Sequence, residues 1–136
     1  MDTFVLDSSA VLRYIDREAG GIRVRAIFEA AAADQAETYI SAVQWGEIAG
    51  RLRTRIGADA QKQALENLAQ LGLQIVSVTA ERAVHAGELR VDRKIAYADA
   101  FALDLAMESP NHVLVTADYG FKPVADLARI EFLPAK

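Results

Sequence analysis

The sequence contains no cysteine and only two histidines among its 136 residues. The absence of cysteine excludes disulfide bridges, thiolate metal sites and cysteine nucleophiles. His85 and His112 lack the short spacing of a histidine metal pair, so neither is expected to bind a metal. We expect both to be ordinary helix or strand-edge residues.

The sequence also lacks any apolar run long enough to span a bilayer. Its N-terminus has Asp2 and no basic segment before the first short apolar stretch, unlike a signal peptide. We therefore expect a cytoplasmic protein that does not bind membranes. Basic residues are not in excess either: the net charge is −4, which argues against broad, nonspecific nucleic-acid binding. It does not exclude a nuclease whose own carboxylates hold cations.

What is present has the composition of one ordinary globular domain. Apolar residues make up 52% and charged residues 25% of the chain, and there is no repeat or linker. We predict a single domain over residues 1–136.

Short apolar segments alternate with helical patterns from end to end. Strands are predicted over 3–6, 38–40, 73–78, 113–116 and 130–133. Helices are predicted over 10–15, 22–33, 41–56, 58–71, 79–91 and 97–107, with Gly57 separating the third from the fourth. This alternation is typical of a parallel sheet covered on both faces. The predicted fold class is three-layer α/β/α with a five-stranded parallel sheet.

Two helices carry apolar stripes that we expect to face the core. In helix 41–56 the stripe contains Trp45, Ile48, Leu52 and Ile56. In helix 22–33 it contains Ile22, Ala26, Ile27 and Ala30.

Two acids follow predicted strands. Asp7 ends the first strand in FVLDSS, and Asp118 follows Thr116 at the end of VLVT. Ligands of open parallel sheets bind beyond the carboxyl ends of the strands. If these two strands are neighbours, both acids share one mouth of the sheet.

Two further acids lie on predicted helices. Glu47 is turned away from the buried stripe, and Asp99 lies near the start of its helix among alanines. Taken singly, each of the four acids is more readily a helix cap or a solvated residue. If they converge, mutual repulsion would raise their pKa values unless a hard divalent cation relieved it. The set Asp7, Glu47, Asp99 and Asp118 therefore predicts a site for Mg²⁺ or Mn²⁺.

Four motifs in order resemble the PIN-domain family over essentially the whole chain. They are DSSAVL, ISAVQWGEI, IAYADAFALDLA and HVLVTADYGF. The resemblance places the family's acidic quartet on Asp7, Glu47, Asp99 and Asp118, and its hydroxyl positions on Ser9 and Thr116. Ser8 remains an alternative to Ser9. Where family members often carry a further acid, this chain has Gly120, so one metal and two metals both remain open.

The small size resembles VapC-type toxins of toxin–antitoxin pairs. This resemblance implies an Mg²⁺- or Mn²⁺-dependent endoribonuclease, a VapB-type antitoxin partner and a homodimer. Apolar residues of the first helices, Tyr14, Ile15 and Ile22, could serve either interface or belong to the core. Arg51, four residues after Glu47, could contact an RNA phosphate or pair with Glu47.

Other protein classes share parts of this pattern. A haloacid-dehalogenase-type phosphatase would need a second aspartate where Ser9 stands. A receiver domain would need an aspartate after the middle strand, and Val76 to Thr79 offers none. A solitary PIN-type nuclease without an antitoxin and a noncatalytic PIN module that binds RNA or protein remain as alternatives.

Overall fold

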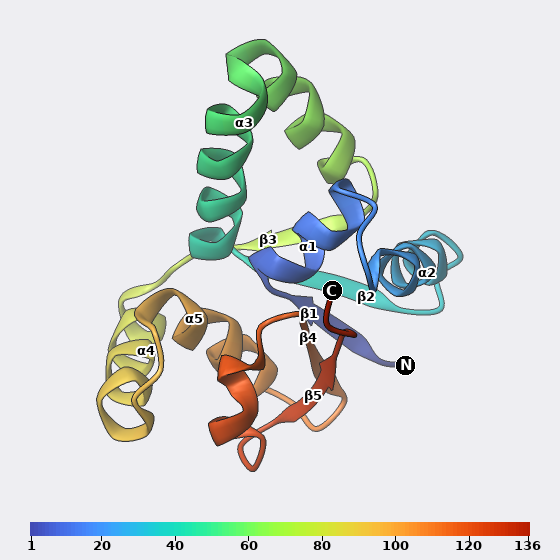
Figure 1. Cartoon of the computed structure of the whole chain (residues 1–136). Helices are drawn as coiled ribbons and strands as arrows, with labels where there is room; N and C mark the ends of the chain where they lie inside the picture. Colours follow the sequence, from blue (N-terminus) through green and yellow to red (C-terminus); the bar gives the residue numbers. More distant parts are fainter.

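The computed structural model describes residues 1–136 as one sheet flanked by helices (Figure 1). The strands are β1 (Thr3–Leu6), β2 (Glu37–Ser41), β3 (Leu73–Val76), β4 (His112–Thr116) and β5 (Arg129–Phe132). The helices are α1 (Ser8–Ile15), α2 (Gly21–Ala32), α3 (Ala42–Ala69), α4 (Ala80–Arg93), α5 (Tyr97–Ala106) and the 3₁₀ helix η1 (Tyr119–Val124). All strand pairs are parallel, in the order β3-β2-β1-β4-β5. The predicted fold class and all five strands are confirmed.

The two faces of the sheet bury separate clusters, because successive side chains of a strand point to opposite faces. Phe4 and Leu6 of β1 pack with α1, α2 and α3 on one face. Val5 packs with α4, α5 and η1 on the other. The central strands β1 and β4 are buried along their whole length. This placement explains why residues 4–6 and 113–115 form continuous apolar runs rather than an alternating pattern.

Gly57 divides α3 into two helical segments. Its backbone has φ 83° and ψ 173°, a conformation essentially restricted to glycine. The break predicted there is confirmed, and Figure 1 shows α3 bending back toward β3 as a long arm. Although α3 has 28 residues, neither it nor any other helix is both long and apolar enough to cross a bilayer.

The stripe predicted for α2 is correct only in part. Ile27 is buried and Ala30 is half-buried, but Ile22 is 87% exposed and Ala26 is exposed, and the other buried positions are Val24 and Phe28. The rotation of α2 is set at its start, because Gly21 lies so close to α1 that an added Cβ would stand 2.6 Å from the Arg13 carbonyl oxygen. The periodicity of the sequence could not predict this contact between two helices.

The stripe predicted for α3 is correct only in part. Ile48 and Leu52 are buried, but Trp45 is half-buried and Ile56 is 48% exposed. Gln44 takes the buried position one turn before Ile48, with no exposed surface. Beyond Leu52 the arm leaves the sheet, so Ile56 has little core to contact.

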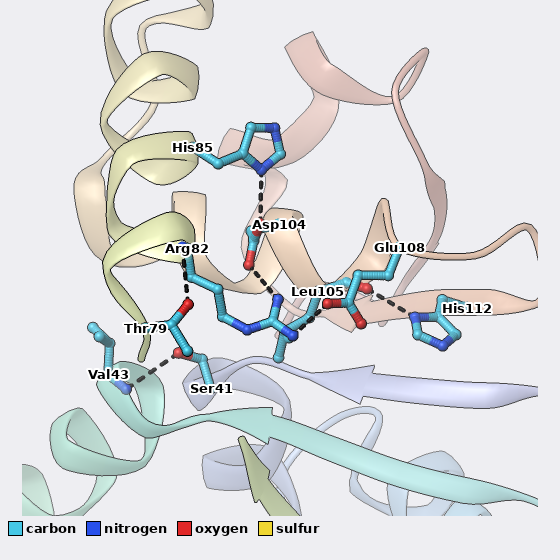
Figure 2. A network of polar contacts seen from close by, with 9 residues as sticks. All are labelled: Ser41, Val43, Thr79, Arg82, His85, Asp104, Leu105, Glu108 and His112. Carbon is cyan, nitrogen blue, oxygen red and sulfur yellow. Dashed lines mark hydrogen bonds and ion pairs between the residues drawn. The ribbon is translucent and has the colours of Figure 1, made fainter. Parts of the chain in front are cut away.

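A polar network joins α4 to α5 on the second face (Figure 2). The Asp104 carboxylate accepts from Arg82 at 2.8 Å and contacts His85 Nδ1 at 2.7 Å. Arg82 also pairs with Glu108, and His112 Nδ1 contacts the Leu105 carbonyl oxygen at 2.8 Å. His85 on α4 and His112 at the start of β4 are thus each hydrogen-bonded to α5.

Candidate metal centre

The carboxyl ends of β1 and β4 lie side by side at the point where the strand order reverses. Leu6 is paired with Val115, and the Asp7 amide donates to the Val115 carbonyl at 3.3 Å. Chain segments more than a hundred residues apart, FVLDSS and VLVTAD, therefore meet at one edge. Such switch points are where open α/β sheets bind ligands.

Asp7 is the most deeply placed of the four acids, at 2% exposure. Its carboxylate caps α1 by accepting from the Ala10 amide at 2.9 Å. It also accepts from the Ser9 and Thr116 hydroxyls at 2.7 and 2.6 Å. Burial raises the pKa of Asp7 to about 6; the three hydrogen bonds lower it and the nearby Asp118 raises it. Asp7 is thus both a helix cap and a buried carboxylate whose charged form is disfavoured by burial.

The hydroxyls of Ser9 and Thr116 connect Asp7 to the loop after β4. Besides donating to Asp7, Ser9 accepts from the Ala117 amide at 2.9 Å. Thr116 accepts from the Asp118 amide, also at 2.9 Å. Asp118 itself is exposed and accepts from the Gly120 amide at 2.8 Å, capping η1. The two hydroxyls therefore connect the turn between β1 and α1 to the residues that directly follow β4.

Ser8 has a different partner from Ser9. Its hydroxyl donates to Glu47 at 3.2 Å. Glu47 reaches the site from α3 and is exposed. The question of which serine matters thus becomes a division of contacts: Ser9 holds Asp7, and Ser8 holds Glu47.

Asp99 completes the set from the first turn of α5. Burial is the largest cause that raises its pKa to about 6, followed by the charges of Asp118, Asp7 and Glu47. The structure thus brings all four sequence-predicted acids into one electrostatic field. They come from four different segments of the chain.

Gln44 is a site residue that sequence reasoning missed. Its amide accepts from the Ser8 N–H and donates to the Ala98 carbonyl, both at 2.7 Å. The available signal was a polar residue at the i position of the stripe formed with Ile48 and Leu52, at i+4 and i+8.

Residues at the rim of the site differ in how firmly they are held. The Tyr119 hydroxyl donates to the Leu133 carbonyl at 2.8 Å, which ties the loop after Asp118 to the C-terminal segment. Arg51 is exposed on α3 and forms no ion pair with Glu47, whereas Arg55 pairs with Asp16 at 2.7 Å. Of the two roles open to Arg51, pairing with Glu47 is therefore not seen.

The donor set has the chemistry that a hard divalent cation requires. All candidate ligands are carboxylate oxygens, with hydroxyls behind them. Burial, and to a smaller extent the charges of neighbouring acids, raises the pKa of Asp7 and of Asp99 to about 6, which disfavours their charged forms when no cation is bound. In the structure no three acids stand close enough to hold one ion together. The chemistry of these four residues fits a hard divalent ion, with Glu47 and Asp118 exposed and Asp7 buried.

The model of the PIN domain matches residues 4–127. The chain belongs to the PIN domain family. The match spans the segments that carry all four acids. No curated protein was found to be similar in sequence.

Several solved structures have the same fold as this PIN domain. VapBC from Salmonella typhimurium, solved bound to DNA, shares 20% identity and a TM-score of 0.75 over 97% of this chain and 98% of that chain. VapC20 from Mycobacterium tuberculosis, described as a toxin that cleaves the sarcin-ricin loop, shares 20% identity and a TM-score of 0.72 over 96% and 99%. FitAcB from Neisseria gonorrhoeae shares 22% identity and a TM-score of 0.65 over 94% and 96%. These likenesses extend over nearly the whole of each chain.

Proposed function

We propose that this chain is a single-domain, Mg²⁺- or Mn²⁺-dependent endoribonuclease. The observation that carries the proposal is the meeting of FVLDSS and VLVTAD at the carboxyl ends of β1 and β4, where Ser9 and Thr116 both donate to the buried Asp7 carboxylate. The charges of Asp118, Asp7 and Glu47 also raise the pKa of Asp99, after burial, which supports a shared site. Membership of the PIN domain family supports the nuclease class. The sarcin-ricin loop is RNA, so the description of the Mycobacterium tuberculosis neighbour supports RNA as substrate.

Asp7, Asp99 and Asp118 would hold one or two divalent ions, and Glu47 would complete or orient the site. A bound divalent ion lowers the pKa of its water to supply a hydroxide near neutral pH, and neutralises charge on the reacting phosphate. Ser9 and Thr116 hold the Asp7 carboxylate in place, because each hydroxyl hydrogen points at it. Neither hydroxyl is a nucleophile, since no histidine base is near: His85 contacts Asp104 and His112 contacts Leu105.

A toxin role with a VapB-type antitoxin is the biological setting that we propose. Several structural neighbours are toxin–antitoxin complexes. We further propose a cytoplasmic homodimer. Ile22 is the residue of the first helices best suited to a partner contact, because it is 87% exposed. Tyr14 and Ile15 instead pack against the core on the face of the sheet covered by α1, α2 and α3.

Arg51 is proposed to contact an RNA phosphate beside the acids. It is exposed one helical turn after Glu47 and has no carboxylate partner. Arg51→Ala should weaken RNA binding and reduce its salt dependence by about one counterion. Arg25→Ala provides a matched control, since Arg25 is an exposed arginine paired with Glu29 on another helix.

The deciding experiment is cleavage of total RNA by the purified protein, with mapping of the cut ends. Cleavage is expected with Mn²⁺ and not with EDTA, and Asp7→Asn should abolish it while circular dichroism shows an intact fold. Full activity of that variant would reject the assignment. A folded wild-type protein that binds RNA without cutting it would instead support the noncatalytic module, and co-purification with a small partner encoded upstream would separate the toxin from a solitary nuclease.

A further inference from the structure

One buried side chain reaches the backbone beside two of the four acids. Gln44 has no exposed surface. Its Oε1 accepts from the amide of Ser8, which follows Asp7, and its Nε2 donates to the carbonyl of Ala98, which precedes Asp99. Both donor–acceptor distances, from Ser8 N to Oε1 and from Nε2 to Ala98 O, are 2.7 Å. The side chain therefore links α1 to α5 through two short hydrogen bonds.

Gln44 also belongs to the helix that carries the third acid. Glu47 lies three residues later on α3, about one helical turn away. A single side chain therefore connects the segments of Asp7, Glu47 and Asp99.

The chemistry of the amide suits this place. A glutamine offers a donor and an acceptor without charge. A glutamate would lose the donor and add a fifth negative charge, and a lysine would bring a cation that competes with a metal ion. An apolar side chain would remove the partner of the Ser8 amide. No buried side-chain polar atom in the structure lacks a partner, so the glutamine fits without cost.

We propose that Gln44 is a positioning residue that sets the spacing of Asp7, Glu47 and Asp99, and so the affinity of the site for a divalent cation. The proposal rests on the proposed metal-dependent function. The four carboxylates repel one another in the absence of a cation. The two hydrogen bonds from the Gln44 side chain to the backbone of Ser8 and Ala98 keep α1 and α5 from separating under that repulsion. Hydrogen bonds that orient metal ligands commonly contribute about 10- to 100-fold in metal affinity.

The test is Mn²⁺ binding by isothermal titration calorimetry to the full chain, comparing wild type with Gln44→Met. Methionine has a similar length and removes both hydrogen bonds. The Mn²⁺ dissociation constant should rise about 10- to 100-fold in protein that circular dichroism shows to be folded. The Mn²⁺ concentration for half-maximal RNA cleavage should shift by the same factor, and saturating Mn²⁺ should recover most of the rate.

Thr38→Val serves as the matched control. Thr38 is as deeply buried as Gln44, and its hydroxyl donates to the Gly72 carbonyl at 3.3 Å, between β2 and the turn before β3. This variant should lose stability and keep the wild-type Mn²⁺ affinity. If Gln44→Met does not fold, Gln44→Asn keeps the amide but is too short to reach both Ser8 and Ala98, and it should weaken Mn²⁺ binding in the same direction.

The outcomes separate the two proposals. Wild-type Mn²⁺ affinity in a folded Gln44 variant, or an equal loss in Thr38→Val, overturns the positioning role while the metal site stands. Absence of Mn²⁺ binding by the wild-type chain overturns the metal site itself, and the role of Gln44 with it.

Discussion

At Asp7 two demands meet in one side chain. It caps α1 through the Ala10 amide, and it presents a buried carboxylate to Asp118 and Asp99. A cap alone needs no such burial, since capping aspartates are usually solvated. The Ser9 and Thr116 hydroxyls compensate in part by donating to it. The remaining cost shows in the pKa, raised to about 6.

Because of Asp7, the metal-free protein should be more stable near pH 4 than near pH 6. Its folded pKa is about 6 against an ordinary 3.8, so the folded state binds more protons than the unfolded state between about pH 4 and pH 6. Stability therefore falls as pH rises through that window, on the order of 3 kcal/mol at roughly 1.4 kcal/mol per pKa unit. Urea unfolding in EDTA at the two ends of the window measures the effect. Asp7→Asn should reduce the difference, leaving the part due to Asp99, whose pKa is also raised to about 6; an unchanged difference would contradict the assignment.

The two serines beside Asp7 should differ in their effect on stability. Ser9→Ala removes the donor to Asp7 and the partner of the Ala117 amide, so we expect a loss of about 1–3 kcal/mol. Ser8→Ala removes only an exposed contact with Glu47 and should change stability by less than about 0.5 kcal/mol. Urea unfolding of both variants in EDTA compares them directly. Equal losses would show that the division of contacts described for the two serines is incorrect.

Among the helices and strands, most could be predicted from the sequence. The apolar runs of β1 and β4 and the break at Gly57 are local features, and all three are where they were predicted. Which face of a helix is buried was harder to predict. Ile22 and Ile56 are exposed because α2 is rotated by the close contact of Gly21 with α1 and because the α3 arm leaves the sheet. Periodicity reports that a helix has an apolar side, and packing decides which part of it is covered.

Gly57 should be the residue on which the shape of the α3 arm depends. Alanine there would adopt φ 83°, so Gly57→Ala should destabilise the protein by about 1–3 kcal/mol. Gly50→Ala is the matched control: Gly50 lies in the regular part of the same helix, with open space around its Cα, and alanine should stabilise by about 0.5–1 kcal/mol. Urea unfolding measures both variants. A neutral Gly57→Ala would mean that the break is not imposed by this residue.

At the scale of the whole molecule, the strand order creates the site. Because β4 pairs directly with β1, residues separated by more than a hundred positions share one mouth, and α3 and α5 each bring one more acid. A second buried acid, Asp104, lies in the α4–α5 network and is neutralised there by Arg82 (Figure 2). The fold thus separates a compensated buried acid from four that have no basic partner.

A divalent cation should stabilise the whole fold through this site. Mn²⁺ at about 100 times its dissociation constant should add about 2.7 kcal/mol, seen as a rise in Tm that EDTA reverses. Asp7→Asn should abolish the rise. Asp104→Asn should lower the starting Tm and keep the rise, because Asp104 lies outside the site. Loss of the rise in both variants would argue against a specific site at Asp7.

The parallel α/β class, the strand positions and the four candidate acids could be predicted from local signals: apolar runs, glycine breaks, acids at strand ends, and the motifs that resemble the PIN-domain family. Which groups meet in space could not be predicted in this way. The tertiary structure placed Ser9 and Thr116 on Asp7, Ser8 on Glu47, and Gln44 between Ser8 and Ala98. Each of these contacts except that between Ser9 and Asp7 joins residues at least 36 positions apart. Their geometry depends on how the helices rotate against the sheet, and no local pattern of residues encodes that rotation.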